Sequence, residues 1–181
     1  MRVVSGACRG LKLETIVEDG IRPTTDKIKE SIFNILQFEI QGKRFLDLFG
    51  GSGQIGIEAA SRGADEVIIV EKNPCALNVI KRNVSKLQNR FNIKVINADA
   101  VDYLINSKNN LDSKVDIAFL DPPYKSNFWP LISEHINSVV KDSGTVITET
   151  SLNAEHRSTI GIFKNTKSYK YGNIQVNFYK I

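Results

Sequence analysis

The hydrophobic and polar positions of this chain predict strands that alternate with helices. Short apolar runs with the length of buried strands lie at 45–49, 67–70, 93–96, 115–120 and 145–148. Between them, apolar residues recur at helical spacing, which predicts helices at 26–36, 54–61, 74–87 and 131–140. A final alternating run predicts a half-buried terminal strand at 174–179. The pattern therefore predicts an α/β fold, with a mainly parallel, Rossmann-like sheet and helices on both faces.

The first 20 residues do not share this alternation. Short apolar runs mixed with three glycines predict a β-hairpin or a loop-rich extension there. Pro23 then disfavours helix at the residue before it, and a residue among 24–26 is expected to cap the helix that follows. We therefore expect an N-terminal hairpin over residues 1–20 and one α/β domain over residues 21–181.

Composition excludes some classes of protein and points only weakly to a partner. Hydrophobic residues make up 41% of the 181 positions, which is enough for a packed core. The net charge of +4 is compatible with a polyanionic partner, although many ordinary proteins reach this value. No apolar run has the length of about 20 residues that a membrane helix needs. The N-terminus also lacks the apolar core of a signal peptide, so a cytoplasmic protein without a membrane partner is expected.

Neither cysteines nor histidines predict a metal site. Cys8 and Cys75 lie far apart and have no metal-binding or disulfide spacing, so we expect two free, reduced thiols. His135 and His156 are expected to be surface or helix residues rather than metal ligands.

Four acidic residues lie at the ends of predicted strands or within the first one. They are Asp47, Glu71, Asp99 and Asp121. In open α/β sheets, ligands bind beyond the carboxyl ends of the strands. Each acid alone is also explained as a solvated strand end or a helix cap. Their recurrence on four strands favours a ligand site at this edge.

A glycine-rich turn after the first strand predicts a nucleotide-like cofactor. Gly51-Ser52-Gly53-Gln54-Ile55-Gly56 matches GxGxxG between a strand and a helix, where glycines let a ligand approach the backbone closely. Glu71, at the end of the next strand, is suited to accept hydrogen bonds from ribose hydroxyls. Both features also fit a dinucleotide site, so by themselves they leave the cofactor open.

Two further acids favour S-adenosylmethionine over a dinucleotide. Asp47 precedes the glycine turn, where it would meet a cationic amino-acid group, directly or through water, and would repel a pyrophosphate. Asp99 ends the third strand, where it could accept from an adenine amino group. The predicted cofactor site comprises Asp47, Phe49, Gly51, Ser52, Gly53, Glu71, Lys72, Ala98, Asp99, Ala100 and Asp121.

Asp121-Pro122-Pro123-Tyr124 is the most specific motif in the chain. An exocyclic amine on a base is a poor nucleophile because its lone pair is delocalised into the ring. The Asp121 carboxylate and the Pro122 carbonyl could accept its two N–H bonds and favour a tetrahedral nitrogen. Tyr124 offers a face on which the base can stack. We therefore predict Asp121, Pro122 and Tyr124 as the catalytic residues. A rigid turn that merely ends a strand is the alternative.

With these motifs the sequence resembles the RsmD-type small-subunit (16S) rRNA guanine-N2 methyltransferases, a branch of the class I S-adenosylmethionine-dependent enzymes. The resemblance covers essentially the whole chain. The segments that carry it are 2–6, 9–13, 22–34, 47–64 and 121–124, and 22–34 distinguishes this family from other amino-methyltransferases. The family usually has Ala where Gly50 stands, a change that we expect to be harmless.

The resemblance implies a seven-stranded class I methyltransferase sheet with a small N-terminal hairpin that helps to grip RNA. It implies methylation of one guanine N2 in 16S rRNA of an assembling small ribosomal subunit. Arg2, Arg9 and Lys12 of the hairpin are then expected to contact RNA, and Arg22 and Thr24 to lie near the cofactor or the target base. The stretch 81–94 contains five basic residues and no acids, and a solvated helix face explains it at least as well as RNA does. A monomer is expected.

Three alternatives stay open from the residues alone. The same motif serves methylation of adenine N6 in DNA or RNA, or of a protein amide. A non-catalytic RNA-binding assembly factor could keep the fold, and a nicotinamide-dependent oxidoreductase could use the glycine turn. Asp47 argues against the oxidoreductase, and the intact motifs argue against the assembly factor.

Overall fold

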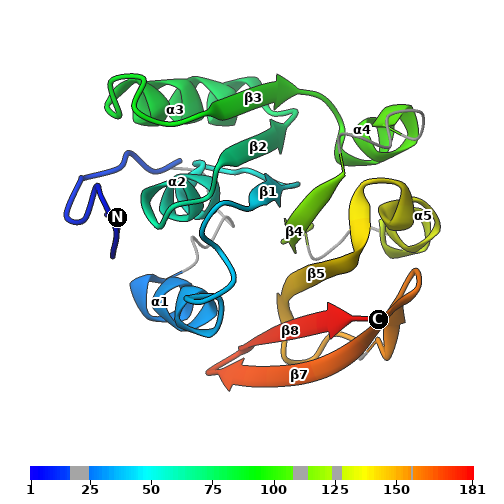
Figure 1. Cartoon of the computed structure of the whole chain (residues 1–181). Helices are drawn as coiled ribbons and strands as arrows, with labels where there is room; N and C mark the ends of the chain where they lie inside the picture. The colour runs from blue at the N-terminus through cyan, green and yellow to red at the C-terminus, as the bar shows by residue number, and fades with distance from the viewer. Residues whose placement is uncertain (17–24, 108–113, 124–127, 156) are drawn as a thin grey trace.

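A computed structural model describes the chain except for residues 17–24, 108–113, 124–127 and 156. Figure 1 shows a sheet with helices on both faces. The elements in chain order are α1 (Asp26–Ile35), β1 (Arg44–Asp47), α2 (Gln54–Ser61), β2 (Glu66–Glu71), α3 (Pro74–Ser85), β3 (Ile93–Asn97), α4 (Ala100–Asn106), β4 (Val115–Leu120), α5 (Trp129–His135), the 3₁₀ helix η3 (Ile136–Ser138), β5 (Val140–Ser151), β6 (Thr159–Ile160), β7 (Phe163–Tyr171) and β8 (Ile174–Lys180).

The sheet has the strand order β3-β2-β1-β4-β5-β8-β7-β6. The five strands β1 to β5 are parallel to their neighbours, whereas β8 pairs antiparallel with both β5 and β7. The order reverses between β1 and β4, because the chain runs outward from β1 to β3 and then returns to the other side of β1. Such a switch point leaves a crevice at the carboxyl ends of the strands, where ligands bind in α/β folds. The predicted α/β class and mainly parallel sheet are confirmed.

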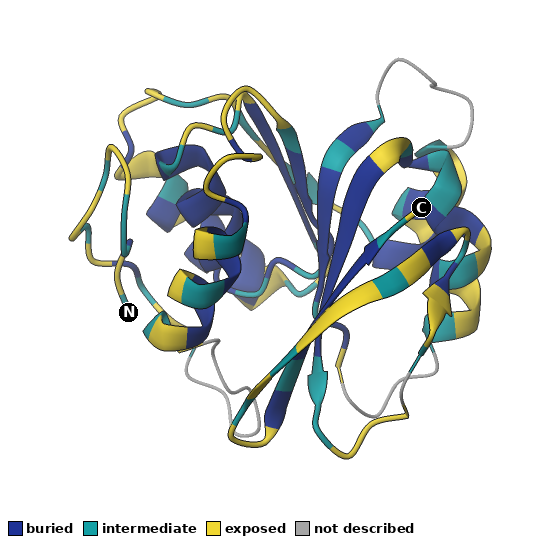
Figure 2. Cartoon of the chain, turned by 60° about the horizontal axis from the view of Figure 1, so that its bottom comes forward, coloured by how far each residue is buried: buried dark blue, intermediate teal, exposed yellow. Residues whose placement is uncertain are grey.

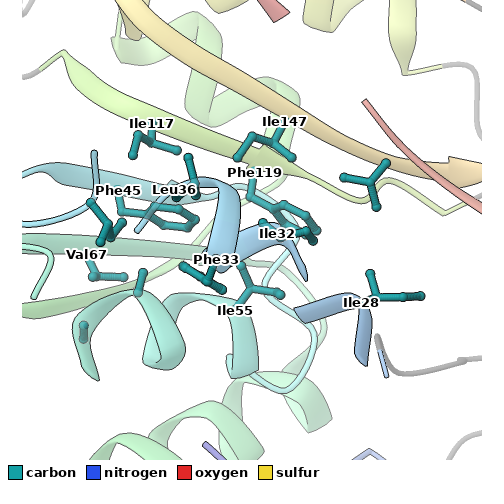
Figure 3. Packing of buried hydrophobic residues seen from close by; sticks show 14 of the residues in the cluster. Ile28, Ile32, Phe33, Leu36, Phe45, Ile55, Val67, Ile117, Phe119 and Ile147 are labelled. Atoms are coloured by element: carbon teal, nitrogen blue, oxygen red, sulfur yellow. The ribbon is translucent and has the colours of Figure 1, made fainter. Parts of the chain in front are cut away.

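Two hydrophobic layers lie on opposite faces of the sheet, because successive side chains of a strand point to opposite sides. On the α1–α3 face, Phe45 and Phe119 of the strands pack against Ile32 and Phe33 of α1, together with residues of α2 and α3. Figure 3 shows these α1 side chains beside the strand residues, and the Phe33 and Phe45 rings lie 6.0 Å apart. On the α4–α5 face, the alternate strand residues pack against α4, α5 and η3. Figure 2 shows the buried strands running between the two groups of helices.

The helices begin where local capping chemistry predicts. Thr25 is the N-cap of α1, and its side chain accepts a hydrogen bond from the Ile28 amide. Asn73 is the N-cap of α3, with Pro74 in the first turn, so both predictions are confirmed. Asp99 is the N-cap of α4, a helix that the hydrophobic pattern did not predict.

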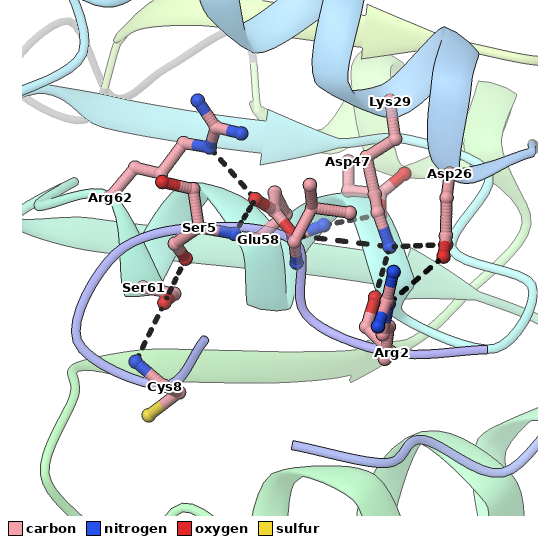
Figure 4. A network of polar contacts seen from close by, with 11 residues as sticks. Arg2, Ser5, Cys8, Asp26, Lys29, Asp47, Glu58, Ser61 and Arg62 are labelled. Carbon is pink, nitrogen blue, oxygen red and sulfur yellow. Dashed lines mark hydrogen bonds and ion pairs between the residues drawn. The ribbon is translucent and has the colours of Figure 1, made fainter. Parts of the chain in front are cut away.

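The N-terminal segment forms the predicted hairpin over its described part, with one antiparallel bridge between Arg2 and Lys12. It is fixed to α2 by buried polar contacts, shown in Figure 4. The fully buried Glu58 carboxylate accepts hydrogen bonds from the Val4 and Ser5 amides at 2.8 and 3.0 Å. The Ser61 hydroxyl accepts from the Cys8 amide at 2.9 Å. The hairpin is therefore packed against the α/β domain along one side.

Two predictions at the C-terminal half are wrong in part. The helix expected over 131–140 ends at His135, and Val140 begins β5. Sheet pairing overrides the helical pattern there, since Val140 pairs with Val115 of β4. The terminal strand β8 is buried on both faces rather than on one, because Val176 and Phe178 pack into the core on one face of the sheet and Tyr179 packs into the core on the other. Its partner β7 was not predicted, since most of its residues are polar and three exposed lysines line it.

No helix in the described part of the chain is both long enough and apolar enough to span a membrane.

Candidate active site

Four carboxyl side chains lie on the α1–α3 face of the sheet, near the carboxyl ends of four adjacent strands. In the order of strands β2, β1, β4 and β5 they are Glu71, Asp47, Asp121 and Glu149. Each stands two positions after a residue of the α1–α3 core, as Asp47 stands after Phe45, and side chains two positions apart in a strand share a face. Sheet topology thus brings together three of the acids predicted from sequence and adds Glu149.

Glu149 was missed because the predicted strand ended at residue 148. The strand β5 in fact continues to Ser151. Glu149 is 2% exposed and directly follows the predicted strand 145–148, as Asp121 directly follows the strand 115–120. That shared position was the signal that could have found it.

Asp47 lies deeper than the other carboxyl groups. It is 1% exposed, and it pairs in register with Ile69 of β2 and Phe119 of β4, two positions before Glu71 and Asp121. Its Oδ2 accepts a hydrogen bond from the Gly56 amide of α2 at 3.0 Å. Burial raises the pKa of Asp47 to about 7; the Gly56 bond opposes this rise and the nearby Glu71 adds to it. A large part of this carboxyl group is therefore protonated at neutral pH.

The glycine turn connects β1 to α2 and is tied to β2. The Gly51 amide donates a hydrogen bond to Glu71 Oε2 at 2.8 Å, and the other Glu71 oxygen accepts from the Lys72 and Asn73 amides. Gly51 has a φ of +54°, and a Cβ placed there would meet no atom within 4 Å. The backbone of the turn consequently faces open space that a ligand can fill.

The glycines at 50 and 56 have a packing role. A Cβ on Gly56 would overlap the Ile69 side chain, so glycine lets α2 lie close to β2. A Cβ on Gly50 would also overlap Ile69. Gly50 stands where the family usually has Ala, and the missing Cβ leaves room for the Ile69 side chain. This agrees with the expectation that the change is harmless.

Asn83 of α3 is hydrogen-bonded to the backbone of the glycine turn. It is fully buried, and its Nδ2 donates to the Ser52 carbonyl at 2.9 Å and to the Glu14 carbonyl at 3.0 Å. Its Oδ1 accepts from the Glu14 amide at 2.8 Å. One amide side chain therefore links the cofactor turn to the strand of the hairpin that leads toward α1. Nothing in the hydrophobic pattern indicated this role.

The rim beside β2 and β3 combines an ion pair with two aromatic rings. Asp99 Oδ1 accepts from the Val101 amide, and its Oδ2 lies 2.9 Å from Lys72 Nζ. Burial raises the pKa of Asp99, but the Lys72 and Val101 hydrogen bonds outweigh it and hold this pKa below its usual range. Lys72 Nζ also lies 5.7 Å from the centre of the Phe128 ring, which packs at 5.7 Å against Phe49. Phe128, which the sequence analysis did not identify, is therefore part of this rim.

Asp121 and Pro122 stand at the centre of the edge, directly after β4. Asp121 is half-buried and Pro122 is buried. Burial, followed by the charges of Glu149 and Asp47, raises the pKa of Asp121 well above its ordinary value. The predicted Tyr124 lies outside the described residues.

The donor set of this edge suits a cationic ligand. Four carboxyl groups converge on one face beside an open glycine turn, and a positive charge placed there would reduce their mutual repulsion. A pyrophosphate would add negative charge to the same place. Gln54, the first residue of α2, adds a buried Oε1 that has no hydrogen-bond partner among the described residues. The geometry therefore fits the sulfonium and ammonium groups of S-adenosylmethionine better than a dinucleotide.

A basic surface lies on the hairpin and the neighbouring helix. Arg2, Arg9 and Lys12 are exposed, as an RNA contact requires. The hairpin packs against α3, where Lys86 and Arg82 pair with Glu14. The helix predicted over 74–87 ends at Ser85, and Lys94 lies in β3, paired with Glu66. The predicted Arg22 and Thr24 lie outside the described residues.

Among the residues that the structure describes, no group of three or more His, Cys, Asp or Glu side chains could hold a metal ion. His135 is buried at the end of α5, so the expectation of a surface or helix position is met by the helix. Cys8 and Cys75 are free thiols.

Comparison with known proteins decides the family. The family described as "Conserved hypothetical protein 95" matches residues 1–180. The "Putative rRNA methyltransferase YlbH" of Bacillus subtilis is 35% identical over 184 residues, covering 99% of this chain and 98% of the relative. The chain belongs to the RsmD-type family. Another relative, "Ribosomal RNA small subunit methyltransferase D" of Escherichia coli, is 32% identical over 90% of this chain and 77% of its own length.

Solved structures agree with this membership. The structure described as "Putative methyltransferase yhhF from Escherichia coli" has a TM-score of 0.83 and 25% identity over 99% of this chain and 96% of its own. The structure described as "Crystal structure of SMU.776, a putative methyltransferase complexed with SAH" has a TM-score of 0.67 and 17% identity over 91% of this chain and 52% of its own. At that identity the second similarity concerns the fold alone.

Proposed function

We propose that this RsmD-type protein transfers a methyl group from S-adenosylmethionine to the exocyclic N2 of a guanine in small-subunit (16S) rRNA. The observation that carries the proposal is the Asp-Pro-Pro turn at the switch point of the sheet, beside buried carboxyl groups and an open glycine turn. The names of the Escherichia coli and Haemophilus influenzae relatives support ribosomal RNA of the small subunit as the substrate.

S-adenosylmethionine supplies an electrophilic methyl group on a positively charged sulfur. The residues proposed to hold it are those of the turn 51–53, Glu71 at the ribose, Asp99 with its backbone neighbours Ala98 and Ala100 at the adenine, and Phe49, Lys72 and Asp47 around them. Glu71 already orients the glycine turn through the Gly51 amide. Asp47 accepts a hydrogen bond from the Gly56 amide in α2, the helix that follows the turn.

Asp121 and Pro122 are proposed to act on the amine. The carboxylate and the Pro122 carbonyl each accept one N–H bond, which draws the nitrogen toward a tetrahedral geometry and directs its lone pair at the methyl group. Proline has no N–H group to compete for these acceptors. Tyr124 is proposed as the stacking partner of the base. Alignment and electrostatics, rather than a covalent intermediate, lower the barrier.

The hairpin is proposed to contact RNA through Arg2, Arg9 and Lys12. Their side chains are exposed, while the backbone beneath them is bonded to Glu58 and Ser61. Because these hydrogen bonds attach the hairpin to the α/β domain, its phosphate contacts would lie at a fixed distance from the catalytic edge. The basic residues at the C-terminal end of α3 are weaker candidates for RNA contact, because Arg82 and Lys86 are paired with Glu14.

The test is transfer of radiolabelled methyl groups to small subunits or 16S rRNA from cells that lack this activity, followed by nucleoside analysis. The wild type is expected to yield N2-methylguanosine and Asp121→Ala none. The exposed Glu134→Gln is the control. Label in N6-methyladenosine or in protein would establish a different substrate for the same chemistry. Absence of cofactor binding in the wild type would refute the enzymatic proposal in favour of an assembly factor.

A further inference from the structure

A polar pocket lies on the α4–α5 face of the sheet, at the carboxyl end of β5. Its floor consists of Thr148 and Thr150 of β5 and of Gln175 and Asn177 of β8. The two strands pair in register at these positions, so the four side chains lie side by side. Two positions before Thr148, the same face carries Val146, which belongs to the hydrophobic core of that face. Polar side chains therefore replace the core where the sheet reaches the edge at which ligands bind in α/β folds.

The pocket adjoins the proposed catalytic turn. Thr148 pairs with Leu120, the last residue of β4, and Asp121 follows directly. Adjacent strands lie about 4.8 Å apart. Leu120 belongs to the core of the α4–α5 face, so Thr148 points to that face, whereas Asp121 lies on the opposite face with the other carboxyl groups. A ligand in the pocket would therefore lie one strand away from the catalytic turn, on the other side of the sheet from the carboxyl groups.

The floor of the pocket is a hydrogen-bonded row of neutral groups. Gln175 Nε2 donates to Asn177 Oδ1 at 2.7 Å, and Asn177 Nδ2 donates to Thr148 Oγ1 at 3.3 Å. These bonds fix the orientation of both amides, while each amide nitrogen carries a second hydrogen. Oriented amides that both donate and accept hydrogen bonds match the edge of a nucleobase. Their oxygen acceptors would find no donor on an ionised phosphate, so the floor favours a base.

One side of the pocket combines an aromatic ring with a cation. The Arg157 guanidinium lies 4.7 Å from the centre of the ring of Trp129, the first residue of α5. The Tyr179 hydroxyl donates a hydrogen bond to the Arg157 carbonyl at 3.1 Å, which ties the backbone of this residue to β8. Bases of single-stranded RNA stack on aromatic rings and on guanidinium planes, and arginine also binds phosphate. This side therefore supplies the stacking and the charge that a nucleotide needs in addition to the neutral floor.

Charged side chains of both signs border the pocket. Glu155, which also lines it, lies 3.6 Å from Arg157, but its side chain is 84% exposed. An exposed ion pair of this kind contributes little, so a phosphate can compete with it. Lys170 of β7 is exposed and pairs in register with Gln175, which places it on the same face of the sheet. Arg157 and Lys170 are thus available beside the floor as contacts for RNA phosphates.

We propose that this pocket binds the nucleotide next to the target guanine in the RNA strand, and that Gln175 and Asn177 form hydrogen bonds to the edge of its base. This inference rests on the proposed function and adds a determinant of sequence to it. The base stacks beside Trp129, and its phosphate contacts Arg157. Because the pocket lies one strand away from Asp121, one nucleotide occupies it while the target guanine lies at the catalytic turn.

The first test measures the affinity of the full-length protein for 16S rRNA as a function of salt. Arg157→Gln and Lys170→Gln should each weaken binding and reduce the slope of log affinity against log salt by about 0.7. Lys167→Gln is the matched control, because Lys167 is an exposed lysine of the same strand whose partner Phe178 belongs to the core of the opposite face. Glu155→Gln should strengthen binding. Wild-type slopes in Arg157→Gln and Lys170→Gln, or an equal loss in Lys167→Gln, would overturn the inference.

The second test measures sequence discrimination once the methylated guanine has been mapped. The nucleotides on either side of it are replaced one at a time, and kcat/KM is measured for each RNA. The wild type is expected to lose about 5–150-fold at one of the two positions. Gln175→Ala should lose most of this preference, with an unchanged KM for S-adenosylmethionine. A folded Gln175→Ala protein with the full preference, or a wild type with no preference at either position, would contradict the proposal.

The two tests separate this inference from the proposed function. The binding test does not depend on catalysis. A protein whose RNA affinity depends on Arg157 and Lys170 but which methylates no guanine would refute the proposed function and leave the RNA site in place. A protein that methylates guanine with the same affinity and the same preference in all variants would refute the pocket alone, and the row of amides would then be structural.

Discussion

Buried charges occur at two places along α2, and the two places differ in how the charges are compensated. Toward the hairpin, the buried Glu58 meets the buried Lys29, Arg62 Nε at 2.7 Å and two backbone amides. At the other end, the sheet brings together the carboxyl groups of Asp47, Asp121 and Glu149, each of which would be negative when ionised. Opposite charges with complete hydrogen bonding are expected where a contact must persist. Like charges are destabilising, and a fold retains them where a ligand or a reaction uses them.

The comparison also distinguishes two kinds of basic residue in the hairpin region. Lys29 is an interior partner that holds the Arg2 backbone, and burial lowers its pKa while Glu58 and Asp26 oppose that shift. Arg9 and Lys12 are exposed on the outside of the same structure. Sequence composition counts these residues alike, although only the exposed ones can reach a phosphate.

The largest effect is expected for Asp121→Asn. This change removes the acceptor charge and one buried like charge, so kcat should fall by about 10²–10⁴-fold, while the melting temperature should stay equal or rise. Single-turnover methylation and calorimetry on the same samples measure both. A simultaneous loss of stability would show that Asp121 is a structural residue. The proposed difference between the Glu58 cluster and the Asp121 cluster would then be wrong.

Glu58→Gln should have the opposite profile. It leaves the buried Lys29 with only the half-exposed Asp26 at 3.7 Å as a charge partner, and breaking a buried pair costs up to about 3–5 kcal/mol of the free energy of unfolding. Urea denaturation measures this cost. Glu39→Gln, which removes an exposed pair with Lys180, is the control and should cost less than about 1 kcal/mol. Equal effects of the two variants would mean that the buried cluster has no special role.

Asp47→Asn should change how stability depends on pH. The folded pKa of Asp47 is raised to about 7 from an ordinary value of 3.8. The folded state therefore binds the proton more tightly, and this residue makes the free energy of unfolding decrease as pH rises from 3.8 to about 7. The variant should lack this decrease, as chemical denaturation across the same range would show. Identical pH dependence in both proteins would exclude a raised pKa.

The smallest effects are expected on the outer side of the hairpin. Lys12→Ala and Arg9→Ala should weaken RNA binding and reduce the slope of log affinity against log salt by about 1 each. Stability and cofactor affinity should not change. Lys43→Ala, at the amino end of β1, is the control. Unaltered slopes would remove the hairpin from the proposed RNA contact.

Local chemistry made much of the fold and part of the site predictable. Asn73-Pro74 and Thr25 begin helices wherever the chain places them, because their capping bonds are formed by residues close in sequence. The acids after the strands could be found because parallel strands end at a common edge. Val140 and the polar β7 could not be assigned in the same way, since their strand pairing is made with distant residues that compensate a weak local pattern.

By itself, the sequence determined the α/β class, the glycine turn, the Asp-Pro-Pro turn and the family, since each is encoded in contiguous residues. Only the tertiary structure decided which charges meet. It placed Glu149 beside Asp121, Lys29 beside Glu58, and Asn83 between the hairpin and the glycine turn. Strand order and helix packing set these neighbours, and the electrostatic energy of a buried group depends on its neighbours and its distance from water rather than on its position in the chain.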